Sequence, residues 1–177
     1  TAEGHVQFRV ISAANRIPAL ENRDVDIVVR NMTINCDRWE QIAFSEQYYE
    51  SGQKVLVSRT DSTGVPTTSI EMTAGMRVCA PSGTTSLANL VARSPEAIPV
   101  VAATHTACLV KFQQGGADAI TGDDTVLAGL AAQDPYAVVT DAPAFTSEPY
   151  GIGVNSADVD LVRFINAVLE QMRADGS

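Results

Sequence analysis

Short apolar runs alternate along the chain with longer stretches in which apolar residues recur every three or four positions. The short runs predict strands, and the spaced pattern predicts helices. The strands are expected at 6–11, 25–29, 54–58, 77–80, 98–102, 117–121, 137–139 and 150–154. The helices are expected at 13–22, 69–73, around 87–91, at 105–114, at 124–132 and from 156 onward, where Ser156 can serve as the N-cap. This order of elements predicts an α/β fold in which helices cover a sheet.

One segment interrupts the pattern. Residues 59–76 are rich in Ser, Thr and Gly and poor in core residues, which is typical of a linker. We therefore expect a partial first lobe at 1–58, a linker or hinge region at 59–76, a second lobe at 77–155 and a C-terminal helix at 156–177.

Composition excludes several classes of function. The chain has 12 basic and 21 acidic residues, a net charge of −9 and no basic cluster, which argues against binding to nucleic acid. The three cysteines and two histidines show no metal-ligand spacing, so neither a metal site nor a cofactor is expected. No pattern pairs a nucleophile with a base. A catalytic function therefore has little support.

The polar segment after the run 25–29 carries the first candidate site. Thr33 and Arg38 follow that buried strand, and a guanidinium can hold a carboxylate through two parallel hydrogen bonds. From spacing alone, an ordinary strand threonine and a solvated arginine are the more frequent explanation of the same residues.

Two further segments lie between a predicted strand and a predicted helix. Ser82-Gly83-Thr84-Thr85 would point backbone donors at an anion, or would simply cap the helix. Of Asp123 and Asp124, one can bind an ammonium group while the other caps the helix that follows, or both serve as caps or surface charges.

Taken in order, three segments resemble the solute-binding proteins of amino-acid ABC importers. They are DIVVRNMTINCDRWEQIAFSEQYY, RVCAPSGTTSLANL and ADAITGDDTVLAGLAA, and the resemblance extends over nearly the whole chain. It is nearest to the glutamate-, aspartate- and glutamine-binding branch of Gram-positive, especially actinobacterial, bacteria. The chain departs from the family pattern at Asn35, Gln47 and Pro81, where a threonine, a proline and a lysine are usual.

The resemblance implies roles for residues of the first lobe. Arg38 would hold the α-carboxylate of a free amino acid, flanked by Thr33 and by the backbone of Asn31. Arg30, at the edge of the loop, would touch the ligand side chain.

The resemblance also assigns the facing wall. Thr84, Thr85 and the backbone of Gly83 would reach the carboxylate from the second lobe, and Asp123 would bind the α-ammonium group.

The fold that the resemblance implies is the two-lobed periplasmic-binding-protein type II fold, with an incomplete first lobe that exposes apolar surface. The function is extracytoplasmic capture of glutamate, glutamine, aspartate or asparagine by hinge closure, for delivery to an ABC permease. The protein would be a lipoprotein on the outer face of the membrane. A sensor domain of the same fold and a cyclohexadienyl-dehydratase-like enzyme are the alternatives.

The family also implies a pairing of cysteines. Cys79 and Cys108 match a second-lobe disulfide of related proteins, whereas Cys36 would stay unpaired. Two buried free thiols are the alternative for the same positions.

Overall fold

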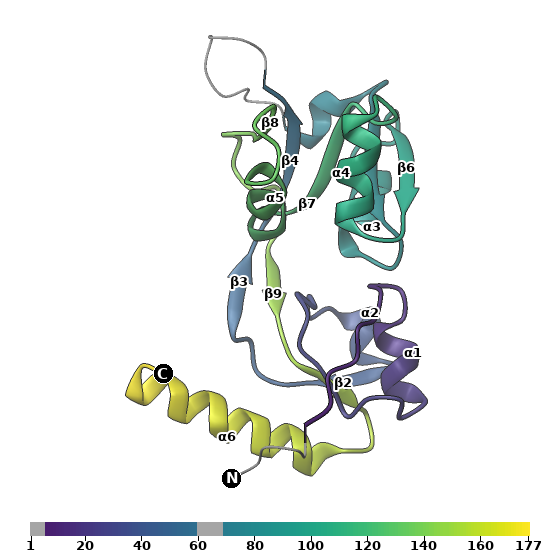
Figure 1. The fold of residues 1–177 in the computed structure, drawn as a ribbon. Helices are drawn as coiled ribbons and strands as arrows, with labels where there is room; N and C mark the ends of the chain where they lie inside the picture. The colour runs from purple at the N-terminus through teal and green to yellow at the C-terminus, as the bar shows by residue number, and fades with distance from the viewer. Residues whose placement is uncertain (1–5, 60–68) are drawn as a thin grey trace.

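The computed structural model describes residues 6–59 and 69–177, which form two lobes joined by a pair of strands (Figure 1). Half of the predicted linker at 59–76, residues 60–68, lies outside the described residues. The helices are α1 (Arg16–Glu21), α2 (Cys36–Trp39), the 3-10 helix η1 (Ile70–Thr73), α3 (Thr85–Arg93), α4 (His105–Gln113), α5 (Asp124–Ala131) and α6 (Val159–Asp175). The strands are β1 (Ile27–Val28), β2 (Ile42–Phe44), β3 (Tyr49–Ser51), β4 (Gln53–Ser58), β5 (Arg77–Pro81), β6 (Ile98–Ala102), β7 (Ala119–Asp123), β8 (Ala137–Val139), β9 (Glu148–Tyr150) and β10 (Gly153–Asn155).

The second lobe is built on a five-stranded sheet in the order β6-β5-β7-β4-β8. Strand β5 runs parallel to β6 and β7, whereas β4 is antiparallel to β7 and β8. Because successive side chains of a strand point to opposite faces, β4 contributes to two cores. Leu56 packs in the core with side chains of α4 and α5, whereas Val55 and Val57 pack in the core with side chains of η1 and α3.

The first lobe is smaller and has a three-stranded antiparallel sheet in the order β1-β10-β2. Its core joins Leu20 of α1 to side chains of β1, β2 and the loop between them, which are Val28, Met32, Ile42 and Phe44. Strand β10 follows the whole second lobe in sequence, so the central strand of this small sheet comes from the part of the chain that returns from the second lobe.

Strands β3 and β9 connect the lobes side by side (Figure 1). They are antiparallel, with Tyr49 opposite Tyr150 and Ser51 opposite Glu148. The chain therefore crosses between the lobes at 49–53 and again at about 145–151.

Apolar side chains lie exposed on the first lobe, in the segment before α1 and on α6. Phe8 is 97% exposed, Val10 is fully exposed, and Phe164 on α6 is 66% exposed. Helix α6 extends away from the body of the lobe (Figure 1), and Ile165 is its one buried residue.

The structure corrects four expectations. The run 54–58 was assigned to the first lobe, but β4 pairs with β7 and β8 of the second. Residues 6–11 are not a strand, because no described strand pairs with them. The run 150–154 is divided between β9 and β10, which belong to different sheets. Helix α6 begins after Asp158 rather than after Ser156.

Candidate ligand-binding site

A cavity of about 400 Å³ lies between the two lobes. Its first-lobe wall comes from α1, the residues just before it and the loop after β1, and its second-lobe wall comes from the first turns of α3 and α4 and from the length of α5. Six of the eight predicted site residues line it, namely Arg30, Asn31, Thr33, Thr84, Thr85 and Asp123. Arg38 and Gly83 are not among the lining residues.

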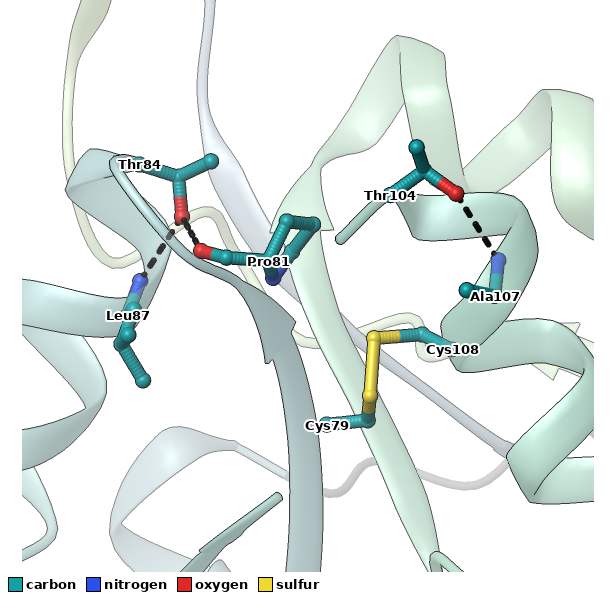
Figure 2. Close-up of a disulfide and its surroundings, with 7 residues drawn as sticks. All are labelled: Cys79, Pro81, Thr84, Leu87, Thr104, Ala107 and Cys108. Carbon is teal, nitrogen blue, oxygen red and sulfur yellow. Dashed lines mark hydrogen bonds between the residues drawn. A yellow bond between two sulfur atoms is a disulfide. The ribbon is translucent and has the colours of Figure 1, made fainter. Parts of the chain in front are cut away.

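Three helices of the second lobe begin at this cavity. Thr84 and Thr104 are the N-caps of α3 and α4, and their hydroxyl oxygens accept from the backbone N–H groups of Leu87 and Ala107 (Figure 2). Thr84 also donates to the carbonyl of Pro81 at 2.7 Å. The capping function of Thr84 is thus observed directly. Helix N-termini carry partial positive charge, which favours anionic groups in the cavity.

Arg38 lies behind the first-lobe wall rather than on it. The side chain is 8% exposed, and Nη1 donates to the Thr33 carbonyl at 2.7 Å. Nη2 reaches the Gly83 carbonyl of the other lobe at 3.5 Å. Burial lowers the pKa of Arg38, while the carboxylates of Glu148 and Asp123 oppose that effect. The guanidinium is therefore held by backbone carbonyls, next to the cavity.

A second buried arginine was not predicted. Arg16 of α1 is 4% exposed and donates to the carbonyls of Ala13, Arg30 and Asn31 at 3.0 Å and to Gly83 at 3.2 Å. Burial, with the nearby charges of Arg38 and Arg30, lowers the pKa of Arg16 to about 10. Periodicity places this residue beside the apolar face of its helix, but gives no sign that its donors cross to the second lobe.

Gly83 is one of the points at which the lobes touch. Its φ is +72°, and a Cβ at this position would lie 2.5 Å from the Cα of Ala14. Both arginines donate to its carbonyl oxygen. A side chain at residue 83 is therefore incompatible with this arrangement of the lobes.

Asp123 ends β7 and Asp124 begins α5, and the two aspartates have different partners. Asp123 is 6% exposed, lines the cavity and accepts from the Tyr150 hydroxyl at 2.6 Å. Asp124 accepts from the Ser51 hydroxyl at 2.6 Å and from the backbone N–H of Thr125 at 2.7 Å. Asp123 therefore faces the cavity, and Asp124 binds the first turn of α5.

Burial dominates the titration of this acid. It raises the pKa of Asp123 from 3.8 to about 6, against the effect of the Tyr150 hydrogen bond. Burial and the bond to Asp123 together raise the pKa of Tyr150 to about 12. His105, which also lines the cavity, has a pKa lowered to about 4 by burial, so its imidazole is neutral at pH 7.

The predicted disulfide is confirmed. Cys79 of β5 and Cys108 of α4 are bonded, with their Cα atoms 5.5 Å apart, and Cys36 is free and exposed. Figure 2 shows the bond between β5 and α4, close to the turn that carries Thr104. The bridge therefore ties one wall of the cavity to the central sheet.

A family model for bacterial extracellular solute-binding proteins, family 3, matches residues 2–177. The chain belongs to this family. Among its relatives, the ABC transporter glutamine-binding protein of Bacillus subtilis (strain 168) is 35% identical over 175 residues, which are 98% of this chain and 62% of that protein. A glutamate-binding protein of Corynebacterium efficiens is 33% identical over 177 residues, 97% of this chain and 60% of that protein.

A solved structure supports the two-lobed fold of this family 3 protein. It is an ancestral amino acid-binding protein, described as a precursor of cyclohexadienyl dehydratase, with a TM-score of 0.86 and 31% identity. The match covers 97% of this chain and 73% of the other. The predicted fold and the predicted branch of the family are both confirmed, and the chain spans about 60% of the length of these curated relatives.

Two further features bear on the class of site. In the described part of the chain, no three side chains of His, Cys, Asp or Glu come together in a way that could hold a metal ion. Within residues 6–59 and 69–177, no helix has the length and apolar character needed to cross a bilayer.

Proposed function

We propose that this family 3 protein binds one polar amino acid between its lobes and delivers it to an ABC importer in the membrane. The observation that carries the proposal is the inter-lobe cavity itself. It has guanidinium groups on and beside its first-lobe wall and a buried carboxylate, Asp123, on its second-lobe wall. A zwitterion offers a complementary charge to each.

Arg38 is the proposed partner of the ligand carboxylate. Its contact with the Gly83 carbonyl is long, at 3.5 Å. An ionised carboxylate makes shorter and stronger bonds with a guanidinium than a carbonyl does. Ligand binding would therefore turn the free edge of Arg38 from Gly83 toward the cavity, while Nη1 stays anchored on Thr33.

Asp123 is the proposed partner of the ammonium group. A fixed positive charge next to a buried carboxylate favours its ionised form, which offsets the desolvation that raises its pKa. Asp123 is held in place by Tyr150. The tyrosine thus fixes the position of the acid that would meet the ligand.

The rest of the cavity suits an uncharged or acidic side chain. Thr104, His105, Thr106 and Gln133 line it, and His105 is neutral at pH 7. Arg30, also in the lining, adds a positive charge. We infer that glutamine, glutamate, asparagine or aspartate is the ligand, in line with the names of the two curated relatives.

The proposed mechanism is hinge closure about β3 and β9. A ligand that touches both lobes binds the closed form more tightly and shifts the population toward it. The closed form would be recognised by the permease on the outer face of the membrane, where a lipid anchor would hold the protein. We propose binding without turnover, in line with the names of the two curated relatives, both of which are binding proteins.

Titration calorimetry of the protein against the twenty common amino acids tests the proposal. We expect saturable heat with glutamine or glutamate, and no heat with any of the twenty would overturn the function. Arg38→Ala should weaken binding by roughly 100-fold or more, since it removes two charge-assisted bonds. Arg38→Lys keeps the charge without the fork and should fall in between.

Arg93→Ala, at the exposed C-terminal end of α3, is the matched control and should bind like the wild type. Thermal unfolding of each variant shows whether it has folded. Wild-type affinity in a folded Arg38→Ala variant would refute the assigned carboxylate partner.

A further inference from the structure

A buried acid, Glu148, lies in the crossing strand β9 and bonds to both lobes. It is 2% exposed. Oε2 accepts from the hydroxyls of Thr33 in the first lobe, at 2.7 Å, and Thr85 in the second, at 2.9 Å. Oε1 accepts from the hydroxyl of Thr146 at 2.7 Å and from Nδ2 of Asn89 at 3.2 Å. All four donors are uncharged.

A hydrogen bond to the buried amide of Gln53 fixes which way Asn89 faces. Gln53 is fully buried, and its Nε2 donates to the Ser86 carbonyl at 3.0 Å and to the Thr121 hydroxyl oxygen at 2.9 Å. Its Oε1 must therefore be the atom that accepts from Asn89 Nδ2, at 2.8 Å. The same Nδ2 then presents its second proton to Glu148.

This network determines where the hydroxyl protons of the cavity residues Thr33 and Thr85 point. A hydroxyl group has one proton to donate and two lone pairs that accept, and a carboxylate can only accept. With their protons on Glu148, Thr33 and Thr85 retain only acceptor capacity. Their oxygens lie 3.4 Å apart across the lobe boundary, and both residues line the cavity that Asp123 also lines.

We propose that Glu148 sets the hydrogen-bond direction of Thr33 and Thr85, so that both hydroxyls accept from the ammonium group of the ligand. This inference deepens the proposed function and rests on it. It reassigns the two threonines, which the family resemblance places on the carboxylate, to the positively charged end beside Asp123. Glu148 is a positioning residue, because it acts through the threonines.

Glu148→Gln reverses the direction of these bonds without changing the shape of the side chain. Asn89 offers a donor, so the amide oxygen of the new residue stays on that side and its nitrogen faces Thr33 and Thr85. Both hydroxyls would then accept from the amide and turn their protons toward the cavity. An ammonium group would meet donors where it had met acceptors.

Calorimetry with L-glutamine and L-glutamate measures the consequence. Whichever of the two amino acids the wild type binds, we expect Glu148→Gln to lower the affinity for it by at least about tenfold. Glu170 is exposed, and Glu170→Gln should leave the affinity unchanged. Unchanged or tighter binding by Glu148→Gln would overturn the proposal, because hydroxyls that serve a carboxylate gain from the reversal.

A double-mutant cycle separates direction from general damage to the fold. Thr33→Val weakens the wild type but should not weaken the Glu148→Gln variant further, because it removes a hydroxyl that already points the wrong way. Losses that add up would mean that Glu148 has only a structural role.

Proton NMR of the ligand-free protein tests the hydroxyl direction alone. The wild type should show two protected hydroxyl resonances, one lost in Thr33→Val and the other in Thr85→Val, and both should shift in Glu148→Gln. Resonances that do not respond to Glu148→Gln would refute the inference. If none of the twenty amino acids binds the wild type, the proposed function fails, while this spectrum still decides the orientation.

Discussion

Asp123→Asn should stabilise the ligand-free protein while it removes ligand binding. In the wild type the carboxylate is 6% exposed, and burial raises its pKa from 3.8 to about 6. At pH 7 the group is therefore ionised in a place that disfavours the charge. In the wild type the Tyr150 hydroxyl donates to the Asp123 carboxylate at 2.6 Å. Asparagine removes the charge and keeps an oxygen that can accept this hydrogen bond.

The magnitude follows from the pKa of Asp123, which lies about two pH units above its ordinary value in the unfolded chain. At 1.36 kcal/mol per pH unit, the ionised form costs about 3 kcal/mol of folding free energy. The folded wild type binds a proton as pH falls through 6, whereas the unfolded chain binds one only near 3.8. Wild-type stability relative to the variant therefore falls as pH rises from about 4 to 6, and stays low above 6.

Urea unfolding of both proteins at pH 4, 5, 6 and 7 checks this prediction. The free energy of unfolding should be higher for Asp123→Asn at pH 7, by up to about 3 kcal/mol, and the gap should close toward pH 4. Asp124→Asn is the neighbouring control. Asparagine keeps one oxygen that can accept from Ser51 and Thr125 but loses the negative charge in the first turn of α5, so this variant should show no gain in stability.

Ligand binding provides the second half of the test. Because the ammonium group needs the ionised acid, wild-type affinity should fall about tenfold per pH unit below pH 6. Two results would refute the raised pKa of Asp123. One is an Asp123→Asn protein that is less stable than the wild type at pH 7, and the other is a difference in stability between the two proteins that does not change with pH.

Two further predictions concern the contact between the lobes and the disulfide. Gly83→Ala should weaken ligand binding, because a Cβ there would lie 2.5 Å from the facing backbone. Gly115 has a similar positive φ but nothing within 4 Å of the added Cβ, so Gly115→Ala should leave the calorimetric affinity unchanged. Equal losses of affinity in the two variants would contradict the role of Gly83 in closure. Replacing Cys79 and Cys108 by serine should lower the free energy of unfolding by about 3–4 kcal/mol in urea titrations, since the bridge closes a 29-residue separation. Thiol counting on denatured, unreduced wild type should find one reactive group; three would contradict the bond.

The strands and helices of the second lobe could be predicted well because each carries its own periodicity. The run 98–102 and the run 137–139 coincide with β6 and β8, and the helix at 105–114 is α4 with one residue fewer. Helix α4 buries Cys108 and Leu109, and β8 buries Ala137 and Val138, so the order of apolar residues contains the signal for both. Strand β6 is mostly exposed, and its run of apolar residues still marks it as a strand. Strands β2 and β3 have three residues each and are defined by their partners, which lie about 100 residues further along the chain.

The lobe boundary was misplaced for a related reason. Strand β4 follows β3 after a single residue, and nothing in its apolar run indicates that the two belong to different sheets. The site shows the same limit. Asp123 follows a buried strand and could be found, whereas Arg16 and Glu148 act through partners more than 60 and 100 residues away.

The paired crossing strands have a mechanical consequence. Two short tethers that are hydrogen-bonded to each other resist twisting and sliding far more than they resist bending, because only bending keeps their shared ladder intact. The two halves of the molecule should thus swing along a single arc. Every amino acid that fits would bring them to the same end point, and the transport machinery would need to distinguish only one shape of loaded protein from the unloaded one.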